Sequence, residues 1–283
     1  MVKKVFKSVG IVARYDKKQA LKLAKELAEY LGRKKLQVYF EDTLAGKVNS
    51  LAKTIPLQSM KTDFIITIGG DGTILRTCIA LPKPESPILA VNMGVRGFLT
   101  EVEPKGACGA VEKILKGDFQ IEKCAKLEIS TDGQVMPDAL NDVVISAGES
   151  SKILYTQIYK NDETILRCQA DGLIASTQTG STGYSLSAGG PVLDPEVDAF
   201  ILTPICSLTV FRSLVFSADS KVTIEAIRPK EMLVLIDGNY RQLVKSKSPR
   251  LTITRSKNVT CLIRFKDDFY QRLRSRLLFK GMG

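Results

Sequence analysis

One apolar run constrains the fold of this chain more than any other feature. Residues 63–68 read Asp-Phe-Ile-Ile-Thr-Ile, and two glycines, Gly69 and Gly70, follow directly. Continuous apolar runs of this kind are typical of strands that a parallel sheet buries on both faces. The run therefore predicts a buried parallel strand that ends in a glycine turn.

Strand and helix patterns alternate through the first part of the chain. Residues 17–32 place their apolar side chains on one helical face, and Gly32 is the expected helix C-cap. Alternation of strands with helices predicts an α/β domain with a parallel sheet, which we assign to residues 1–122. The other expected elements are strands at residues 5–12, 36–40 and 88–92 and a helix at residues 106–115.

The pattern changes after about residue 120, where turn pairs such as Asn161-Asp162 separate short β-prone segments. Many short strands with turn signals predict an all-β, sandwich-like domain, which we assign to residues 123–260. One helix is expected there, after the Gly/Ser/Thr-rich residues 179–190, and residues 261–283 are expected to return to the first domain. The predicted strands are 126–130, 140–146, 153–159, 172–177, 199–203, 221–227, 232–236 and 250–254.

The chain has no histidine, and this excludes several catalytic arrangements. Ser-His-Asp triads, Cys-His dyads and HExxH zinc sites all require imidazole. Acid–base chemistry near neutral pH must therefore come from a carboxylate, a lysine, a cysteine or a tyrosine. The six cysteines are scattered and form no CxxC pair, so we predict no protein metal site and a reducing, cytoplasmic location. No apolar run approaches the roughly 18 residues that a membrane helix needs.

Positive charge is concentrated late in the chain. Residues 241–283 carry 12 basic and 2 acidic side chains, whereas residues 1–240 carry 29 basic and 28 acidic ones. A basic segment raises nucleic acid or another polyanion as a partner. Because this segment is mostly late β-strand, we expect a solvated face or a subunit contact, which also steers anionic ligands.

The first motif is Gly69-Gly70-Asp71-Gly72-Thr73, between the predicted strand and a helix that begins at about Thr73. Glycines let the backbone approach a ligand closely, and helix N-termini favour anions, so these residues favour phosphate binding. Asp71 would repel phosphate unless it abstracts a proton from an attacking hydroxyl or holds Mg²⁺. The alternative is a plain turn in which Asp71 caps the helix.

The second motif spans residues 171–191, where eleven of the fifteen residues 176–190 are Ser, Thr or Gly. Such a loop offers small hydroxyl donors and exposed backbone N–H groups, which suit ribose and phosphate oxygens. Tyr184 adds an aromatic face, and Asp171 can accept a hydrogen bond from a sugar hydroxyl or an amide. A flexible linker is the alternative, but apolar residues on both sides argue against it.

Together the two motifs, about 100 residues apart, resemble the NAD kinase family. Asn141-Asp142 is similar to the family's short Asn-Glu/Asp motif, and Asp237-Gly238-Asn239 to its late Asp-Gly turn. Residues 203–206 and Arg212 resemble a further family segment. The resemblance covers roughly residues 60–240, with the motifs in the family's order.

Some positions depart from the family pattern. Gln178 and Gly183 stand where Pro and Ala are common, as in archaeal members. Gln169 stands where an arginine often lies, with Arg167 two positions before it.

The resemblance implies transfer of a phosphoryl group from ATP to the 2′-hydroxyl on the adenosine ribose of NAD, giving NADP. It also implies a phosphofructokinase-like parallel sheet, Mg²⁺ bound with the nucleotide, and a homodimer or homotetramer. Asp71 is the expected general base, as the only acidic residue of its loop, while Arg76 and Lys152 are candidates to neutralise phosphate. The expected nucleotide-binding residues are Gly69, Gly70, Asp71, Gly72, Thr73, Arg76, Asn141, Asp142, Lys152, Asp171, Thr182, Gly183, Tyr184, Ser185, Leu186, Ser187 and Asn239.

Three other functions use the same residues. Lipid and sugar kinases share the GGDGT motif, but they do not explain the second loop. A basic nucleic-acid-binding protein would use aromatic residues of the basic segment, such as Phe269 and Tyr270, although neither nucleic acid nor membrane is the partner we expect. A non-catalytic dinucleotide sensor is the third, and the intact Asp71 argues against it. The phosphoryl donor, ATP or polyphosphate, and the choice between NAD and NADH stay open.

Overall fold

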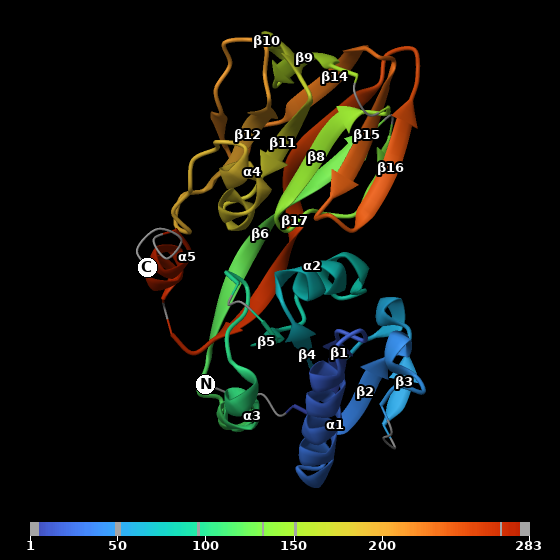
Figure 1. Ribbon diagram of the computed structural model, residues 1–283, viewed down its shortest axis with the longest axis vertical. Coiled ribbons are helices and arrows are strands. Elements are labelled where there is room, and N and C mark those ends of the chain that lie inside the picture. The colour runs from blue at the N-terminus through green and yellow to red at the C-terminus, as the bar shows by residue number, and fades with distance from the viewer. Residues whose placement is uncertain are drawn as a thin grey trace. The chain divides into compact units, whose positions relative to one another are not determined.

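A computed structural model describes residues 6–48, 52–94, 97–131, 133–149, 152–266 and 268–277 (Figure 1). The chain divides into two compact units, residues 1–123 with 260–283, and residues 124–259. Both divisions fall inside long strands, β6 (Gln120–Thr131) and β17 (Arg250–Arg264). Each of these two strands therefore contributes residues to both units.

The first unit is built on a parallel sheet whose strands follow the order β3-β2-β1-β4-β5. The end of β17 adds to this sheet, because Leu262 pairs with Ile88 of β5 in parallel. The strands are β1 (Ser8–Ala13), β2 (Gln37–Glu41), β3 (Lys53–Ile55), β4 (Phe64–Gly69) and β5 (Ile88–Asn92).

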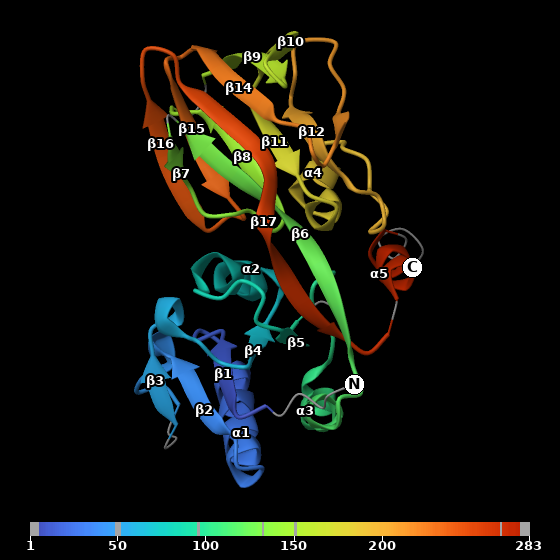
Figure 2. The ribbon, with the colours of Figure 1, turned by 180° about the vertical axis from the view of Figure 1, so that it is seen from behind.

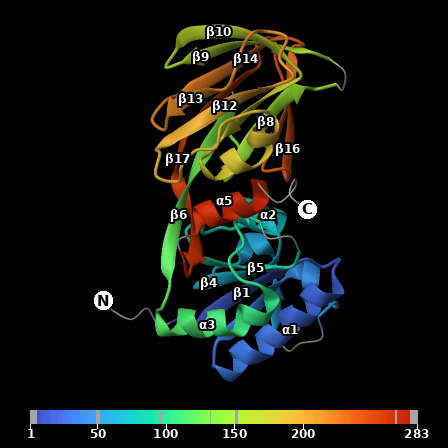
Figure 3. The same cartoon turned by 60° about the vertical axis from the view of Figure 1, so that its left-hand side comes forward.

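Helices cover both faces of this parallel sheet. Helices α1 (Lys18–Arg33) and α3 (Ala107–Lys116) lie on one face, and α2 (Asp71–Ala80) lies on the other (Figure 3). Alternate strand residues such as Ile11 and Ile66 pack against Leu27 of α1 and Ile114 of α3, and all four are fully buried. This alternation follows from the two-residue period of a strand. A fourth helix, α5 (Phe269–Leu277), follows β17.

The second unit is an antiparallel β sandwich. One sheet has the order β13-β12-β11-β8-β15-β16, of which β12 to β16 are labelled in Figure 2. The other strands follow the order β10-β9-β14-β17, and β6 pairs with both β17 and β7. The short helix α4 (Tyr184–Ser187) interrupts the strands. The strands are β7 (Gln134–Val135), β8 (Asp142–Ala147), β9 (Leu154–Lys160), β10 (Glu163–Ala170), β11 (Gly172–Ser176), β12 (Ala199–Ile205), β13 (Leu214–Ser217), β14 (Val222–Arg228), β15 (Glu231–Ile236) and β16 (Tyr240–Lys245).

The predicted fold class is confirmed, but two local predictions are wrong. Gly32 does not end α1, because the N–H groups of Lys34 and Lys35 continue to bond to carbonyls of the last turn, and Lys35 takes the left-handed conformation with φ 62°. The helix expected after residues 179–190 instead lies inside them, where a 3₁₀ turn at Thr179–Thr182 precedes α4. Hydroxyls such as that of Ser181, which donates to the Gln178 carbonyl, close these turns locally.

The late basic residues are not all solvated. Arg250 and Arg255 form exposed ion pairs, as expected of a solvated face. Arg264 and Arg272 are only 5% and 7% exposed, so the prediction is wrong for these two residues. Both guanidinium groups donate hydrogen bonds to backbone carbonyls of the first unit, which offset part of the cost of burying them. No helix within the described residues has both the length and the apolar character of a membrane span.

Candidate functional site

The first motif lies at the carboxyl edge of the parallel sheet. Strand β4 ends at Gly69, and α2 begins at Asp71, two residues before the predicted start. In the order β3-β2-β1-β4-β5, β2 and β3 are added on one side of β1, and β4 and β5 are added on the other side. The strand order therefore reverses between β1 and β4. Open α/β sheets bind ligands outside the carboxyl ends of their strands, where the strand order reverses in this way. The glycine loop therefore occupies the position that favours a ligand.

The glycines of this loop differ in how much space surrounds them. A Cβ atom at Gly69 would lie 2.1 Å from the hydroxyl oxygen of Thr73 and 3.2 Å from Cγ of Arg14, so Gly69 permits close packing of β4 against its neighbours. A Cβ atom at Gly70 or Gly72 would meet no atom within 4 Å. The N-cap residue of α2 is Gly70, and no side chain makes a capping hydrogen bond to the N–H groups of the first turn. The loop thus presents open backbone and the positive end of a helix.

Asp71 does not cap α2, so the capping interpretation is wrong. Its Oδ2 accepts the backbone N–H of Phe98 at 3.0 Å, and its Oδ1 accepts the N–H of Leu99 at 3.2 Å. Both donors belong to a segment that follows β5, the neighbour of β4 in the sheet. Since the two oxygens have separate donors, the carboxylate is held in one orientation at the edge of the glycine loop.

Three cations lie on the elements around this loop. Arg76 of α2 places Nη2 2.9 Å from both carboxylate oxygens of Glu41, which is fully buried, so its charge is already compensated. Arg14 follows β1 and forms an ion pair with Asp16, and Lys17 donates to the carbonyl of Met93 at 3.3 Å. The sequence reasoning missed Arg14 and Lys17. Their place directly after β1, the strand beside β4, is the signal that identifies them.

The second motif meets the Asn141-Asp142 motif in the second unit. Strands β8 and β11 pair so that Asp142 lies opposite Ser176. The carbonyl of Asn141 accepts the N–H of Thr177 at 2.9 Å, and a Cβ atom at Gly180 would lie 2.0 Å from the same oxygen. The loop after β11 therefore wraps closely around Asn141 and Asp142, and only glycine fits at residue 180.

A buried carboxylate holds the Asn141-Asp142 turn from behind. Asp237 accepts the backbone N–H groups of Leu140, Asn141 and Asp142 at 2.7, 2.8 and 3.0 Å. Burial, and secondarily the charge of Asp237, raise the pKa of Asp142 to about 7. Burial also raises the pKa of Asp237, although its three N–H bonds oppose this. The sequence predicts the neighbouring Asn239 as a contact but not Asp237. The Asp-Gly turn at residues 237–238 is the sequence feature that points to Asp237.

Two further candidates, Asp171 and Lys152, lie away from Asn141 in the second unit. Asp171 is exposed and directly precedes β11, about 16 Å of extended strand from Ser176. Lys152 follows the opposite end of β8 from Asp142 and forms an ion pair with Glu149 at 2.7 Å. The structure therefore does not bring Asp171 or Lys152 to Asn141.

Residues of the loop and of α4 point in different directions. Thr182 is buried and donates to the carbonyl of Thr179 at 3.2 Å, while a Cβ atom at Gly183 would lie 3.8 Å from Oδ2 of Asp142. Within α4, Tyr184 and Ser187 are exposed, Leu186 is half-buried, and Ser185 is buried, with Oγ 2.9 Å from the hydroxyl of Thr203. Asn239 closes its own turn by donating to the Asp237 carbonyl at 2.6 Å.

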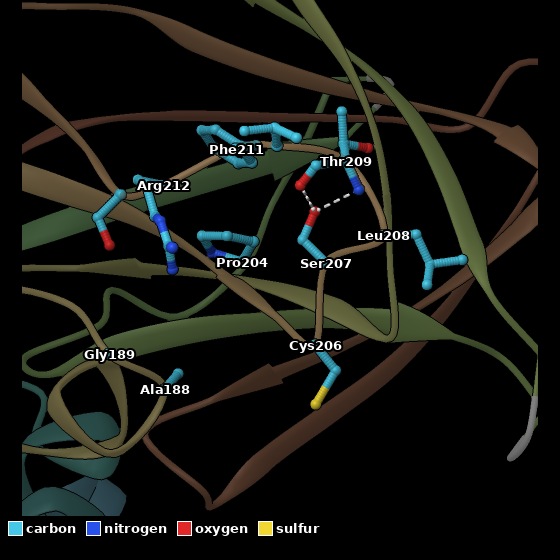
Figure 4. Close-up of a pocket in the computed structure, with 11 residues that line it drawn as sticks. Ala188, Gly189, Pro204, Cys206, Ser207, Leu208, Thr209, Phe211 and Arg212 are labelled. Carbon is cyan, nitrogen blue, oxygen red and sulfur yellow. Dashed lines mark hydrogen bonds between the residues drawn. The ribbon is translucent and has the colours of Figure 1, made fainter.

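A pocket of about 430 Å³ in the second unit is lined by the family-like segment around Pro204, Cys206 and Arg212 (Figure 4). Ser207 shapes this segment, because its Oγ accepts the N–H of Thr209 at 3.1 Å and lies 3.0 Å from the Thr209 carbonyl. Asp171 borders the same segment, since its N–H donates to the carbonyl of Ile205 at 3.0 Å. The pocket and Asp171 thus form a second group of polar residues in this unit.

Both parts of the chain match known proteins. The chain matches the model of the ATP-NAD kinase N-terminal domain over residues 9–119 and that of the ATP-NAD kinase C-terminal domain over residues 140–265. It is 36% identical over 277 residues to the NAD kinase of Methanothermobacter thermautotrophicus, covering 97% of each chain.

Two solved structures share the fold. An NAD kinase from Archaeoglobus fulgidus in complex with ATP superposes with a TM-score of 0.78 at 25% identity, over 98% of this chain and 100% of the other. A yeast NADH kinase in complex with NADH superposes with a TM-score of 0.88 at 23% identity, over 99% of this chain and 90% of the other. The chain therefore belongs to the NAD kinase family, a family of phosphotransferases.

Proposed function

We propose that this NAD kinase transfers the terminal phosphoryl group of ATP to the 2′-hydroxyl on the adenosine ribose of NAD. The observation that carries the proposal is the carboxylate of Asp71, which two backbone N–H groups hold at the edge of the glycine loop. The 2′-oxygen forms a bond to the terminal phosphorus as the bond to the bridging oxygen of ADP breaks. The hydroxyl proton passes to Asp71, and the products are NADP and ADP.

Asp71 is suited to act as the general base. Each of its oxygens accepts one N–H bond, and a carboxylate oxygen has a further lone pair that can take a proton. The chain has no histidine that could compete for this role. Fixing the carboxylate also limits the reorganisation that proton transfer requires.

Phosphate binding rests on the glycine loop in this proposal. N–H groups at the start of α2, with Gly69, Gly70, Gly72 and Thr73, would hold the transferring phosphate. Arg14, directly after β1, would add positive charge, and Arg76 would add positive charge once it left Glu41.

Mg²⁺ bound on the triphosphate would neutralise its charge during the transfer. In the described ranges, no three His, Cys, Asp or Glu side chains converge on a site for a metal ion. The residues present therefore fit a Mg²⁺ that the nucleotide carries and that keeps much of its water.

The acceptor would bind where the second loop wraps Asn141 and Asp142. A carboxylate accepts hydrogen bonds from ribose hydroxyls, and Asp142 lies beside Gly183 of the second loop. Thr182, Tyr184 and the rest of α4 would line the dinucleotide, together with Asn239. The exposed ring of Tyr184, 48% accessible, offers a stacking surface for a base.

A homodimer or homotetramer is part of the proposal. Asp171 lies a full strand length from Ser176, so a second copy of the chain would bring its own Asp171 and Lys152 to the dinucleotide. A cytoplasmic location is also proposed, because the exposed thiols of Cys108 and Cys206 suit a reducing compartment.

The proposal is tested by incubating the purified protein with NAD, ATP and Mg²⁺ and measuring NADP with an NADP-specific dehydrogenase. Polyphosphate replaces ATP, and NADH replaces NAD, in parallel reactions. Asp71→Asn should lose most turnover while it still binds NAD in a calorimetric titration. Formation of no NADP from any donor would overturn the proposed reaction, and full turnover of Asp71→Asn would overturn the proposed base.

A further inference from the structure

The backbone that holds Asp71 is itself held from the other side. The carbonyl of Phe98 and the N–H of Leu99 belong to one peptide group. Its N–H donates to Oδ1 of Asp71 at 3.2 Å, while its carbonyl accepts a hydrogen bond from Nη1 of Arg272 at 3.0 Å. A trans peptide group is planar, and its N–H and C=O point in opposite directions. A bond that fixes the carbonyl therefore also fixes the direction of the N–H toward Asp71.

A second guanidinium holds the same stretch of backbone. Arg264 donates to the carbonyl of Leu99 at 3.1 Å and to that of Phe98 at 3.4 Å. The Phe98 carbonyl thus accepts from both arginines, and bonds to a peptide carbonyl polarise the N–H of the same peptide group, here the one that donates to Asp71. The side chain of Phe269, in the first turn of α5, also packs against the Phe98 ring, with centroids 6.3 Å apart.

Both guanidinium groups are buried, which requires specific compensation. Arg272 forms an ion pair with Asp268 at 2.9 Å, and Arg264 forms one with Glu101 at 3.1 Å. Burying charges is expensive unless partners satisfy them, and replacing such pairs by apolar groups is often neutral for stability. Stability alone therefore does not account for two buried arginines that both donate to the carbonyl of Phe98.

We propose that Arg272 is a positioning residue for phosphoryl transfer, which aims the carboxylate of Asp71 through the peptide between Phe98 and Leu99. Arg264 supports the same peptide. The inference rests on the proposed role of Asp71 as general base. It also assigns a task to the basic end of the chain, because α5 acts on the site through one buried guanidinium.

The test compares Arg272→Met and Arg272→Lys with Arg274→Met. Arg274 lies on the same helix but is exposed, so its variant controls for the loss of a positive charge from α5. Each substitution is made in the wild-type chain and in Asp71→Asn, and kcat and the KM values for NAD and ATP are measured. Thermal unfolding shows that each variant is folded at the assay temperature.

A positioning role predicts a specific pattern. In the wild-type background, Arg272→Met should lower kcat by about 10- to 100-fold with KM values within about twofold, as expected for a misplaced reacting group. Arg272→Lys, which keeps the charge and the partner Asp268, should retain more activity. In the Asp71→Asn background, Arg272→Met should cause little further loss, because residues that act through one another are not additive. Equal factors in both backgrounds, or a change in KM alone, would overturn the proposal.

A second measurement does not depend on the residual activity of Asp71→Asn. Hydrogen exchange of the Phe98–Leu99 amides should become faster in Arg272→Met and stay unchanged in Arg274→Met, while the strands of the sheet keep their protection. Unchanged exchange in Arg272→Met would contradict the inference. Full turnover of Asp71→Asn would instead remove the proposed base, so the two failures are distinguishable.

Discussion

A Cβ atom on Gly97 would lie 1.9 Å from Oδ1 of Asp71, so the carboxylate of Asp71 occupies the space that any larger residue at position 97 would need. Gly97 thus sets the position of the proposed base as directly as the N–H groups beside it do.

Gly97→Ala is therefore expected to lower kcat by at least about tenfold, because the added methyl group displaces the carboxylate from its N–H donors. The displaced atom is the end of a side chain, so the free energy of unfolding should change by less than about 1 kcal/mol. Steady-state kinetics and urea unfolding measure the two effects. Gly109→Ala in α3, where a Cβ meets no atom within 4 Å, is the control and should keep full activity. Wild-type turnover in Gly97→Ala would contradict the prediction.

Asp237→Asn should loosen the turn that carries Asn141 and Asp142. The two carboxylate oxygens of Asp237 accept three N–H bonds. An amide has a single oxygen, and its NH₂ group would face at least one of the backbone donors. We expect a loss of about 1–3 kcal/mol in unfolding free energy and a KM for NAD that rises more than the KM for ATP. Asp219→Asn, which changes an exposed carboxylate of the same unit, is the matched control. A rise in the KM for ATP alone would argue against this role.

The raised pKa of Asp142 predicts a pH-dependent stability. Burial and the charge of Asp237 raise this pKa to about 7 from the ordinary value of 3.8. At pH 5 the folded protein keeps a proton that the unfolded chain has mostly released, so this group stabilises the fold at low pH, and the advantage is lost as the pH rises toward 7.

Asp142→Asn removes this titration. The fall in unfolding free energy between pH 5 and pH 8 should then be smaller by about 2 kcal/mol than in the wild type. Part of the fall should persist, because burial also raises the pKa of Asp237. Urea unfolding at pH 5 and pH 8 measures the fall in unfolding free energy of each protein. Equal falls in the two proteins would show that Asp142 titrates normally.

Arg76 can be tested as a phosphate contact separately from its ion pair. Arg76→Met leaves the fully buried Glu41 without its arginine and should cost about 3 kcal/mol. The double variant Arg76→Met with Glu41→Gln should recover most of this stability. If Arg76 also binds phosphate, the KM for ATP stays raised in the double variant. Recovery of both stability and KM would restrict Arg76 to a structural role.

The glycine loop could be predicted because its signals are local. A continuous apolar strand followed by Gly69 and Gly70 defines a turn at a sheet edge, and Asp71 stands out as the only acid in it. The predicted parallel sheet and the later β sandwich also follow from short-range periodicity. Edge strands escaped prediction, since most side chains of β10 and β16 are exposed or half-buried and show little apolar contrast.

The residues that hold Asp71 in place could not be predicted in this way. The N–H of Phe98 lies 27 residues after Asp71, and every residue type except proline offers such a donor. Arg272 reads as one more cation of a basic segment, and only the fold places it against a carbonyl 174 residues earlier. Long-range contacts of this kind depend on the tertiary structure, which sequence periodicity does not specify.

The first unit is interrupted in the sequence, since residues 124–259 are inserted between its two parts. A ribosome therefore produces the glycine loop early and Arg264 and Arg272 only after the whole second unit has been made. A nascent chain that has completed β5 and α2 already contains Asp71 but lacks the two guanidinium groups that hold the peptide beside it. On the proposed roles, the carboxylate of Asp71 is aligned only after Arg264 and Arg272 have been made, and a translation product that stops before them would turn over more slowly even with every nucleotide-binding loop present.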